Sequence, residues 1–302
     1  MRREYLVSHI QENAHEADIY SLCVISGRLW SASGDSKIKQ WNVESAEHEL
    51  VEEIDTPHKI GIHNMAASLE EQLLVSCGFG QDVYLWDPST NSSRLLGDSV
   101  EHPGECWSAC ISPDAQTISF TSVDGRVCVW DTLGNTKVAD LDTKGKFGLC
   151  TAYSPNGRFI ASGHQTGQLF LISTETGRLF HTLSGHTLPL RSLAFSPGSS
   201  LLAAAGDSKM ITVYDVISGD QVGQLRGHSA WIFALAFNPV GDLLLSADIE
   251  GCIKVWDMDT MECISTKNEV DGAIWAVAWY NNGFVVAGAD RSILWYRAAA
   301  SE

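Results

Sequence analysis

The chain has 302 residues, of which 44% are apolar and 19% are charged. This composition is that of a globular protein with a large core, and it excludes an intrinsically disordered chain. The formal net charge of −17 repels phosphate polyanions, so we expect no direct binding to DNA or RNA. We expect no membrane segment, because no signal peptide is visible and no apolar run approaches the roughly 18 residues that a span needs.

A strand-like segment that ends in Trp-Asp, or in a degenerate copy of it, recurs seven times along the chain. In chain order the copies read KIKQWN, VYLWD, VCVWD, QLFLIS, ITVYD, IKVWD and SILWYR. Their aromatic or apolar marker falls at positions 41, 86, 130, 172, 214, 256 and 296, with spacings of 45, 44, 42, 42, 42 and 40. So regular a period indicates a repeat architecture.

A second marker lies upstream in each unit and is clearest at Gly185-His186 and Gly227-His228. Looser copies lie at 14–15, 57–58 and 101–102, and Lys144 and Val270 occupy the position in the degenerate units. Short β-type segments and turns separate the two markers, and no segment has a helical period. The pattern resembles the WD-repeat β-propeller and predicts one all-β, seven-bladed domain over residues 1–302. This prediction replaces the two domains that length alone suggests.

The ends of the chain predict how the ring closes. The last unit stops at Tyr296-Arg297, after its third strand, and therefore lacks a fourth. Residues 4–10, EYLVSHI, precede the first His marker and have no unit of their own. We expect residues 1–10 to supply the closing strand of the last blade, which removes two open sheet edges.

The resemblance also implies a hydrogen-bonded cluster of His, Ser or Thr, a turn Asp and Trp inside each blade. The set is complete in two units: His15, Ser33, Asp35 and Trp41, and His102, Ser122, Asp124 and Trp130. Unit six departs from it with Glu250 at the turn position, and unit four lacks the His, the Asp and the Trp. We interpret these His–Asp pairs as structural rather than catalytic, because they recur once per blade without a nucleophile.

No pattern predicts an enzyme, a metal site or a cofactor. The chain contains no P-loop, HExxH or GxSxG motif, and GFGQDV from Gly78 lacks the third glycine of a dinucleotide fingerprint. His58 and His63 are five residues apart on a strand-like segment, so they point to opposite faces. The eight cysteines form no CxxC pair, which favours reduced, buried thiols over a disulfide framework or a zinc site.

The residues that follow each His marker predict a binding surface at one rim of the central channel. The fifth residues, which begin the innermost strands, are Tyr20, His63, Trp107, Leu149, Arg191, Phe233 and Trp275. The third residues are Asp18, Gly61, Glu105, Phe147, Pro189, Trp231 and Ala273. We interpret them as an apolar protein-binding patch with one cation, Arg191, and two acids, Asp18 and Glu105. The alternative is that half of these side chains pack between the blades.

A narrower resemblance lies in residues 141–197, above all in Asp142 to Phe147 and Gly185 to Ser192. This stretch resembles the WD-repeat subunit of the superkiller complex. The resemblance implies a non-enzymatic scaffold, in the cytoplasm and nucleus, that assists exosome-mediated mRNA decay with a helicase and a tetratricopeptide-repeat subunit. In fungi it also implies partners among the proteins that make meiotic DNA double-strand breaks. Partner segments of the Gln-Arg-x-x-apolar type are expected on the rim.

Two alternatives remain open within the same fold. One is a subunit of a chromatin complex of the polymerase-associated factor type. The other is a reader of modified peptides, which would need an acidic or aromatic cage in the channel. Asp18, Glu105 and the tryptophans are compatible with such a cage.

Overall fold

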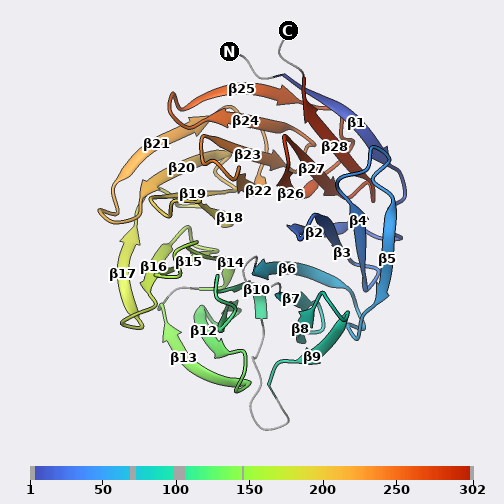
Figure 1. Cartoon of the computed structure of the whole chain (residues 1–302). Helices are drawn as coiled ribbons and strands as arrows, with labels where there is room; N and C mark the ends of the chain where they lie inside the picture. The colour runs from blue at the N-terminus through green and yellow to red at the C-terminus, as the bar shows by residue number, and fades with distance from the viewer. Residues whose placement is uncertain (1–3, 69–72, 98–105, 145, 300–302) are drawn as a thin grey trace.

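Seven four-stranded antiparallel sheets form a ring in the computed structural model, which describes residues 4–68, 73–97, 106–144 and 146–299 (Figure 1). Within these residues there is no helix, and hence none that is long and apolar enough to cross a membrane. The prediction of an all-β, seven-bladed propeller is therefore confirmed.

Each blade places one strand at the channel and one at the periphery, with two between them. The innermost strands are β2 (Ile19–Ile25), β6 (Ile62–Ser68), β10 (Cys106–Ile111), β14 (Gly148–Tyr153), β18 (Leu190–Phe195), β22 (Ile232–Phe237) and β26 (Ile274–Tyr280). The second strands are β3 (Arg28–Ser33), β7 (Leu73–Gly78), β11 (Thr117–Ser122), β15 (Phe159–His164), β19 (Leu201–Gly206), β23 (Leu243–Asp248) and β27 (Gly283–Gly288). The third are β4 (Lys37–Asn42), β8 (Val83–Asp87), β12 (Arg126–Asp131), β16 (Leu169–Ser173), β20 (Met210–Asp215), β24 (Ile253–Asp257) and β28 (Ile293–Ala298). The outermost are β5 (Leu50–Asp55), β9 (Ser92–Leu95), β13 (Thr136–Asp142), β17 (Arg178–Leu183), β21 (Gln221–Arg226), β25 (Glu262–Lys267) and β1 (Tyr5–Gln11).

Burial follows this order of strands and explains their composition. Every residue of the second strands β15, β23 and β27 is buried, because neighbouring blades cover both faces of each sheet. Such strands read as nearly continuous apolar runs rather than as alternating ones. All four residues of the peripheral strand β9 are exposed, and its sequence is Ser-Ser-Arg-Leu. The core is thus a set of apolar layers between adjacent blades.

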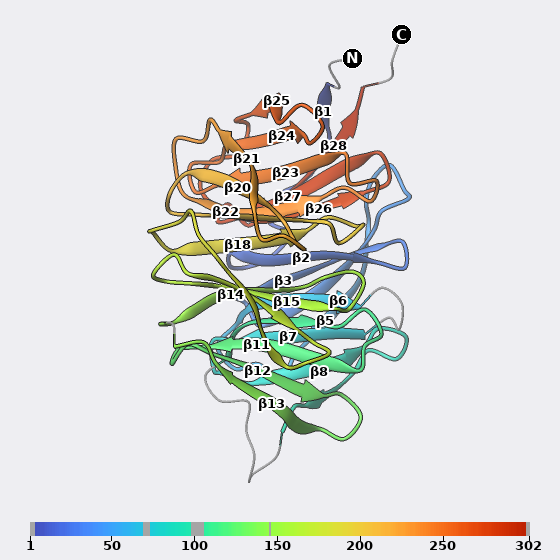
Figure 2. The same cartoon turned by 90° about the vertical axis from the view of Figure 1, so that its left-hand side faces the viewer.

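The closing strand lies where the sequence predicts it, displaced by one residue. β1 pairs antiparallel with β28, from Tyr5 opposite Ala298 to Gln11 opposite Ile293, and completes the sheet β1-β28-β27-β26. Both views show β1 and β28 side by side (Figures 1 and 2). Tyr5 is 2% exposed, and its ring centroid lies 5.1 Å from that of Phe284.

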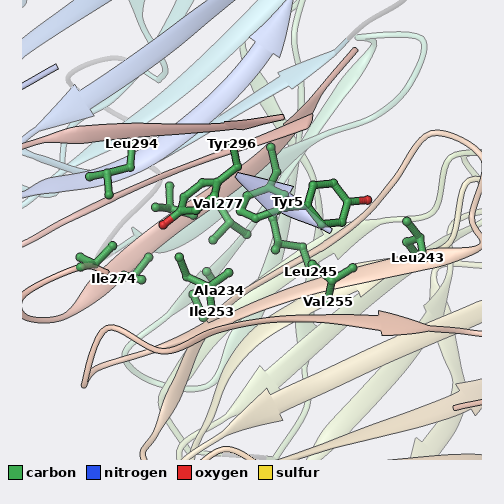
Figure 3. Close-up of a cluster of buried hydrophobic side chains, with 14 residues drawn as sticks. Tyr5, Ala234, Leu243, Leu245, Ile253, Val255, Ile274, Val277, Leu294 and Tyr296 are labelled. Atoms are coloured by element: carbon green, nitrogen blue, oxygen red, sulfur yellow. The ribbon is translucent and has the colours of Figure 1, made fainter. Parts of the chain in front are cut away.

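The seam between blades 6 and 7 encloses the buried end of β1. Tyr5 packs with Tyr296 of blade 7 and with Leu245 and Val255 of blade 6 in one apolar cluster (Figure 3). The N-terminal strand therefore contributes a large side chain to the core as well as backbone hydrogen bonds.

The polar cluster of blade 1 uses a different serine from the predicted one. His15 Nε2 lies 2.8 Å from Ser31 Oγ, Trp41 Nε1 donates to the same oxygen at 2.9 Å, and His15 Nδ1 lies 2.9 Å from Asp35 Oδ2. Ser33 bonds with the backbone instead: its hydroxyl donates to the carbonyl of Ala17 and accepts from the N–H of Asp35. The reason is register. Trp41 pairs with Leu29, so its indole reaches the diagonal neighbour Ser31 rather than the end of the strand.

The same register shows that the predicted bond between Trp130 and Ser122 in blade 3 is wrong. The position ten residues before Trp130 is Phe120, and the buried Trp130 Nε1 has no hydrogen-bond partner among the residues that the structure describes. Ser122 instead donates to Asp124 within the turn. His102 lies outside the described residues. Blade 3 is thus held at this point by apolar packing, including a contact of 6.4 Å between the Phe120 and Trp130 ring centroids.

Blade 6 has the complete cluster, which corrects the prediction that it departs from the set with Glu250 at the turn position. His228 lies 2.7 Å from both Ser246 Oγ and Asp248 Oδ2, and Trp256 Nε1 donates to Ser246 at 2.8 Å. Asp248 reaches the imidazole from two positions before the expected turn residue. In blade 2, Gly78 stands at the same distance before Trp86 as Asp248 does before Trp256.

The imidazole of blade 2 consequently has one unpartnered nitrogen. His58 Nε2 lies 2.7 Å from Ser76 Oγ, but His58 Nδ1 has no hydrogen-bond partner in the described part of the chain. A Cβ atom at Gly78 would lie 2.3 Å from that nitrogen, so glycine is required there. Burial lowers the pKa of His58 to about 4.

Blade 4 lacks the marker residues and uses a histidine from its second strand. His164 Nε2 lies 3.2 Å from Ser162 Oγ, and Nδ1 donates to the carbonyl of Lys146 at 2.6 Å. Blade 4 therefore has a polar cluster of its own, although it lacks the His, the Asp and the Trp of the repeat.

Candidate functional site

A β-bulge at the start of every innermost strand creates the candidate site. In each blade the pairing of the first two strands skips one residue, for example Tyr20 between Ile19 and Ser21. A bulge leaves the extra residue unpaired and re-aims its side chain. The seven skipped residues form what we call the rim: Tyr20, His63, Trp107, Leu149, Arg191, Phe233 and Trp275. They are the seven fifth residues that the repeat spacing selects.

One arc of the rim runs from blade 1 backwards through blades 7, 6 and 5. The Trp275 ring centroid lies 6.0 Å from that of Tyr20 and 4.9 Å from that of Phe233. The guanidinium carbon of Arg191 lies 5.1 Å from the Phe233 centroid and 5.8 Å from that of Trp231. These spacings are those of aromatic and cation–π contacts, so the arc is continuous.

The other arc runs from blade 1 through blades 2 and 3 to blade 4. Phe79 joins Tyr20 to His63, with centroid distances of 5.4 and 4.9 Å. His63 stacks on Trp107 at 5.1 Å, and Trp107 contacts Phe147 at 5.1 Å. The predicted patch omits Phe79. The signal for it is an exposed aromatic residue in the loop between the second and third strands, which faces the same rim.

A cavity of about 350 Å³ lies between the two arcs and is lined by residues of the rim and by Phe79. Trp107, Trp231 and Phe79 are 36%, 42% and 40% exposed. Leu149 is buried, and the remaining rim side chains are half-buried. Many rings thus pack against each other and still leave an apolar surface open to solvent. That this surface binds proteins stays a prediction.

The predicted charges of the rim differ from those observed. Arg191 is no free cation: its Nε and Nη2 donate to Asp207 Oδ1 and Oδ2 at 2.8 and 3.1 Å. Asp18 accepts a hydrogen bond from Trp275 Nε1 at 3.0 Å. Glu105 lies outside the described residues. The hydrogen-bond donor beside the Asp18 carboxylate is therefore the uncharged indole N–H of Trp275.

Burial keeps the titratable rings of the rim neutral. It lowers the pKa of His63 to about 4, although a hydrogen bond with the backbone of Gly78 acts in the opposite direction. The pKa of Tyr20 is raised, first by burial and then by the charge of Asp18. The rim therefore presents neutral aromatic and imidazole rings beside the side chain of Asp18.

Hydrogen bonds between blades hold the rim in place from below. The side chain that follows the bulge residue reaches the innermost strand of the next blade in several places. Ser21 Oγ donates to the carbonyl of Met65 at 3.0 Å, and Asn64 Oδ1 accepts from the backbone N–H of Ala109 at 2.8 Å. These bonds line a channel cavity of about 370 Å³ beneath the rim. They make the rim a pre-formed platform rather than a set of independent loops.

One group of potential metal ligands exists in the described part of the chain. His228, Asp248 and Cys252 place one ligand atom each within 4.8 Å of one another. Both nitrogens of His228 are occupied by Ser246 and Asp248, and burial raises the pKa of Cys252 to about 11. These residues are explained by the structural cluster of blade 6.

Comparison with known proteins agrees with the architecture. Residues 94–131, 177–215 and 219–257 match the WD domain, G-beta repeat family. The second and third of these stretches each combine the outermost strand of one blade with three strands of the next, which is why the strands are offset from the repeats.

The whole chain is 77% identical, over 302 residues, to the meiotic recombination protein Rec14 of Schizosaccharomyces pombe, covering all of both sequences. The chain belongs to the Rec14 family of WD-repeat proteins. The WD repeat-containing protein VIP3 of Arabidopsis thaliana is more distantly similar: it is 26% identical over a stretch that covers 60% of this chain and 61% of that protein. The human echinoderm microtubule-associated protein-like 3 is 27% identical over 55% of the chain and 18% of its own length.

Proposed function

We propose that this member of the Rec14 family is a non-enzymatic scaffold that acts in meiotic recombination by holding partner proteins at its rim. The observation that carries the proposal is the identity of 77% with a meiotic recombination protein over the full length of both chains. The propeller supports a scaffold role, because its rim offers a cavity lined mostly by aromatic and apolar side chains, whereas the one group of potential metal ligands in the described residues lies within blade 6.

The chemistry of the rim supports short partner segments of the Gln-Arg-x-x-apolar type. The cavity between Tyr20, Trp107 and Trp275 suits an apolar side chain, and aromatic residues are typical anchors of such interfaces. A partner arginine would bind the Asp18 carboxylate, since charge-assisted hydrogen bonds of this kind are strong. Proteins that make meiotic DNA breaks are the partners that the resemblance implies.

A second part of the proposal rests on the resemblance of residues 141–197 to the WD-repeat subunit of the superkiller complex. In that role the chain would bind a tetratricopeptide-repeat subunit and a helicase, assist mRNA decay in the cytoplasm, and enter the nucleus for its meiotic role. Affinity purification from vegetative cells tests it, with stoichiometric recovery of both subunits as the expected result. Their absence would remove this role and leave the meiotic one standing.

A genetic replacement tests the meiotic role. Expression of this chain in a fission-yeast strain that lacks Rec14 is expected to restore meiotic recombination between marked loci. Variants Trp107→Ala and Trp275→Ala are expected to accumulate normally and fail to restore it. Leu133→Ala, at an exposed position outside the rim, is the matched control and should behave as the unmodified chain. A well-expressed chain without effect on recombination would contradict the proposal.

A further inference from the structure

Two thiols from neighbouring blades meet beneath the rim. Cys77 lies in β7 of blade 2 and Cys106 begins β10 of blade 3, and these strands pack against each other (Figure 1). Their Sγ atoms are 3.0 Å apart although the residues are 29 positions apart in the sequence. The distance exceeds the sulfur–sulfur bond length of about 2.05 Å by only about 1 Å. Small rotations about the two Cα–Cβ bonds can supply that displacement.

The pair is buried in the apolar seam between these blades. Cys77 and Cys106 are 0% and 3% exposed, and they share one cluster with Val83, Ala109 and Phe120. Burial, followed by the contact with Cys77, raises the pKa of Cys106 well above its ordinary value. The Cys106 thiol is thus protonated at neutral pH, and burial protects both cysteines from fast reaction with solutes.

We propose that Cys77 and Cys106 are a redox pair that forms a reversible disulfide and locks blade 2 to blade 3. The oxidant is a low-molecular-weight disulfide. During a local opening of the seam, one cysteine thiolate attacks the oxidant, forms a mixed disulfide and releases one small thiol. The second cysteine then attacks the mixed disulfide and releases the second small thiol. Two protein thiols lose two electrons and two protons, and the oxidant is reduced to two thiols.

The position of the pair connects the lock to the rim. Trp107 follows Cys106 directly, and only Gly78 separates Cys77 from Phe79. A disulfide would therefore tie together the two backbone segments that carry these exposed aromatic side chains. The inference depends on the seam alone and does not require the proposed meiotic role.

Mass spectrometry of the folded, full-length chain tests the proposal. The exposed Cys263 would acquire a mixed disulfide, so the experiment uses the Cys263→Ser background. The protein is incubated with oxidised glutathione and then denatured in the presence of N-ethylmaleimide, which alkylates the thiols that are still free. It is then digested without reduction. We expect a cross-linked peptide that joins Cys77 to Cys106 and a loss of two hydrogen atoms in mass. Dithiothreitol should reverse both.

Two variants and one thermal measurement complete the design. Cys77→Ser is expected to abolish the cross-link, and Cys252→Ser, in a different blade, should retain it. Oxidation should raise the melting temperature by about 5 °C, since the bond closes a loop in the unfolded chain. A fully alkylated protein, glutathione adducts alone, or a disulfide that joins either residue to Cys110 or Cys128 would overturn the proposal. The cross-link is detected in the Cys263→Ser protein itself, so the test stays valid even if Cys77→Ser fails to fold.

Discussion

Trp275 donates its indole N–H to Asp18 Oδ2 at 3.0 Å and thereby connects the last blade to the first across 257 positions of sequence. Both residues face the rim, so this bond places part of the binding surface on the seam where the ring closes. The integrity of the rim consequently depends on ring closure, which β1 completes.

Removal of the closing strand is expected to destabilise the whole ring. Deletion of residues 1–10 exposes one edge of β28 and removes Tyr5 from the core between blades 6 and 7. We expect aggregation or a loss of several kcal/mol in the free energy of unfolding. The milder variant Tyr5→Ala should cost about 3 kcal/mol through the cavity that it leaves. Light scattering and thermal melting measure both, and a monomeric deletion variant with unchanged melting temperature would exclude this role of β1.

The polar clusters predict that a Trp→Phe substitution lowers the free energy of unfolding more in blade 6 than in blade 3. Trp256→Phe removes the hydrogen bond to Ser246, whereas Trp130→Phe removes no such bond because Phe120 occupies the serine position. Both variants lose similar apolar area. We therefore expect Trp256→Phe to cost about 1 kcal/mol more than Trp130→Phe in urea unfolding. Equal losses would show that the indole hydrogen bond contributes nothing measurable.

The Asp35 cluster predicts an acid-sensitive contribution to stability. Burial alone would raise the pKa of Asp35, but hydrogen bonds with His15 and with the backbone N–H groups of Glu16 and Lys37 outweigh it and hold the pKa at about 2. Because the folded pKa is below the ordinary value, the stabilisation is present above about pH 4 and is lost as the pH falls towards 2.

Unfolding experiments on Asp35→Asn measure this contribution. We expect the variant to lose about 2 kcal/mol at pH 7 and to approach the stability of the unmodified chain near pH 2. A difference between the two proteins that does not change with pH would contradict the assignment.

Charge predicts that any contact with nucleic acid is made through partners. At a net charge of −17, the purified chain should show no measurable binding to single-stranded RNA or to DNA duplexes at physiological salt. Fluorescence anisotropy with labelled oligonucleotides measures this directly. Micromolar binding that weakens as salt is added would refute it.

The sequence predicts the number of blades, the closing strand and the positions of the rim, because all three follow from a repeat with a nearly constant period. It does not predict the pairing of side chains between neighbouring positions. Ser31 and Ser33 lie on the same face of β3, and only the register of Trp41 against Leu29 selects Ser31. The partners Asp207 and Phe79 lie in loops whose course depends on tertiary packing rather than on the repeat.

The β-bulges are likewise not predicted by the sequence. The sequence spacing selects Tyr20 and the equivalent residue of each blade, but it gives no sign that these residues are skipped in the pairing of the first two strands. The bulge explains why large side chains can occupy these positions, since they need not fit the ladder. It also explains why Arg191 can turn towards Asp207 and Phe233 together.

Calorimetric titration of the purified chain with a synthetic Gln-Arg-x-x-Leu peptide tests the claim that the rim binds partner segments. The claim predicts saturable binding that Trp275→Ala weakens by about 2 kcal/mol, a factor of roughly 30, because the aromatic wall of the cavity is lost. Circular dichroism should show that the variant is folded, and Leu133→Ala should bind as the unmodified chain. A folded Trp275→Ala variant that binds the peptide with unchanged affinity, or an unmodified chain that does not bind it, would contradict the claim.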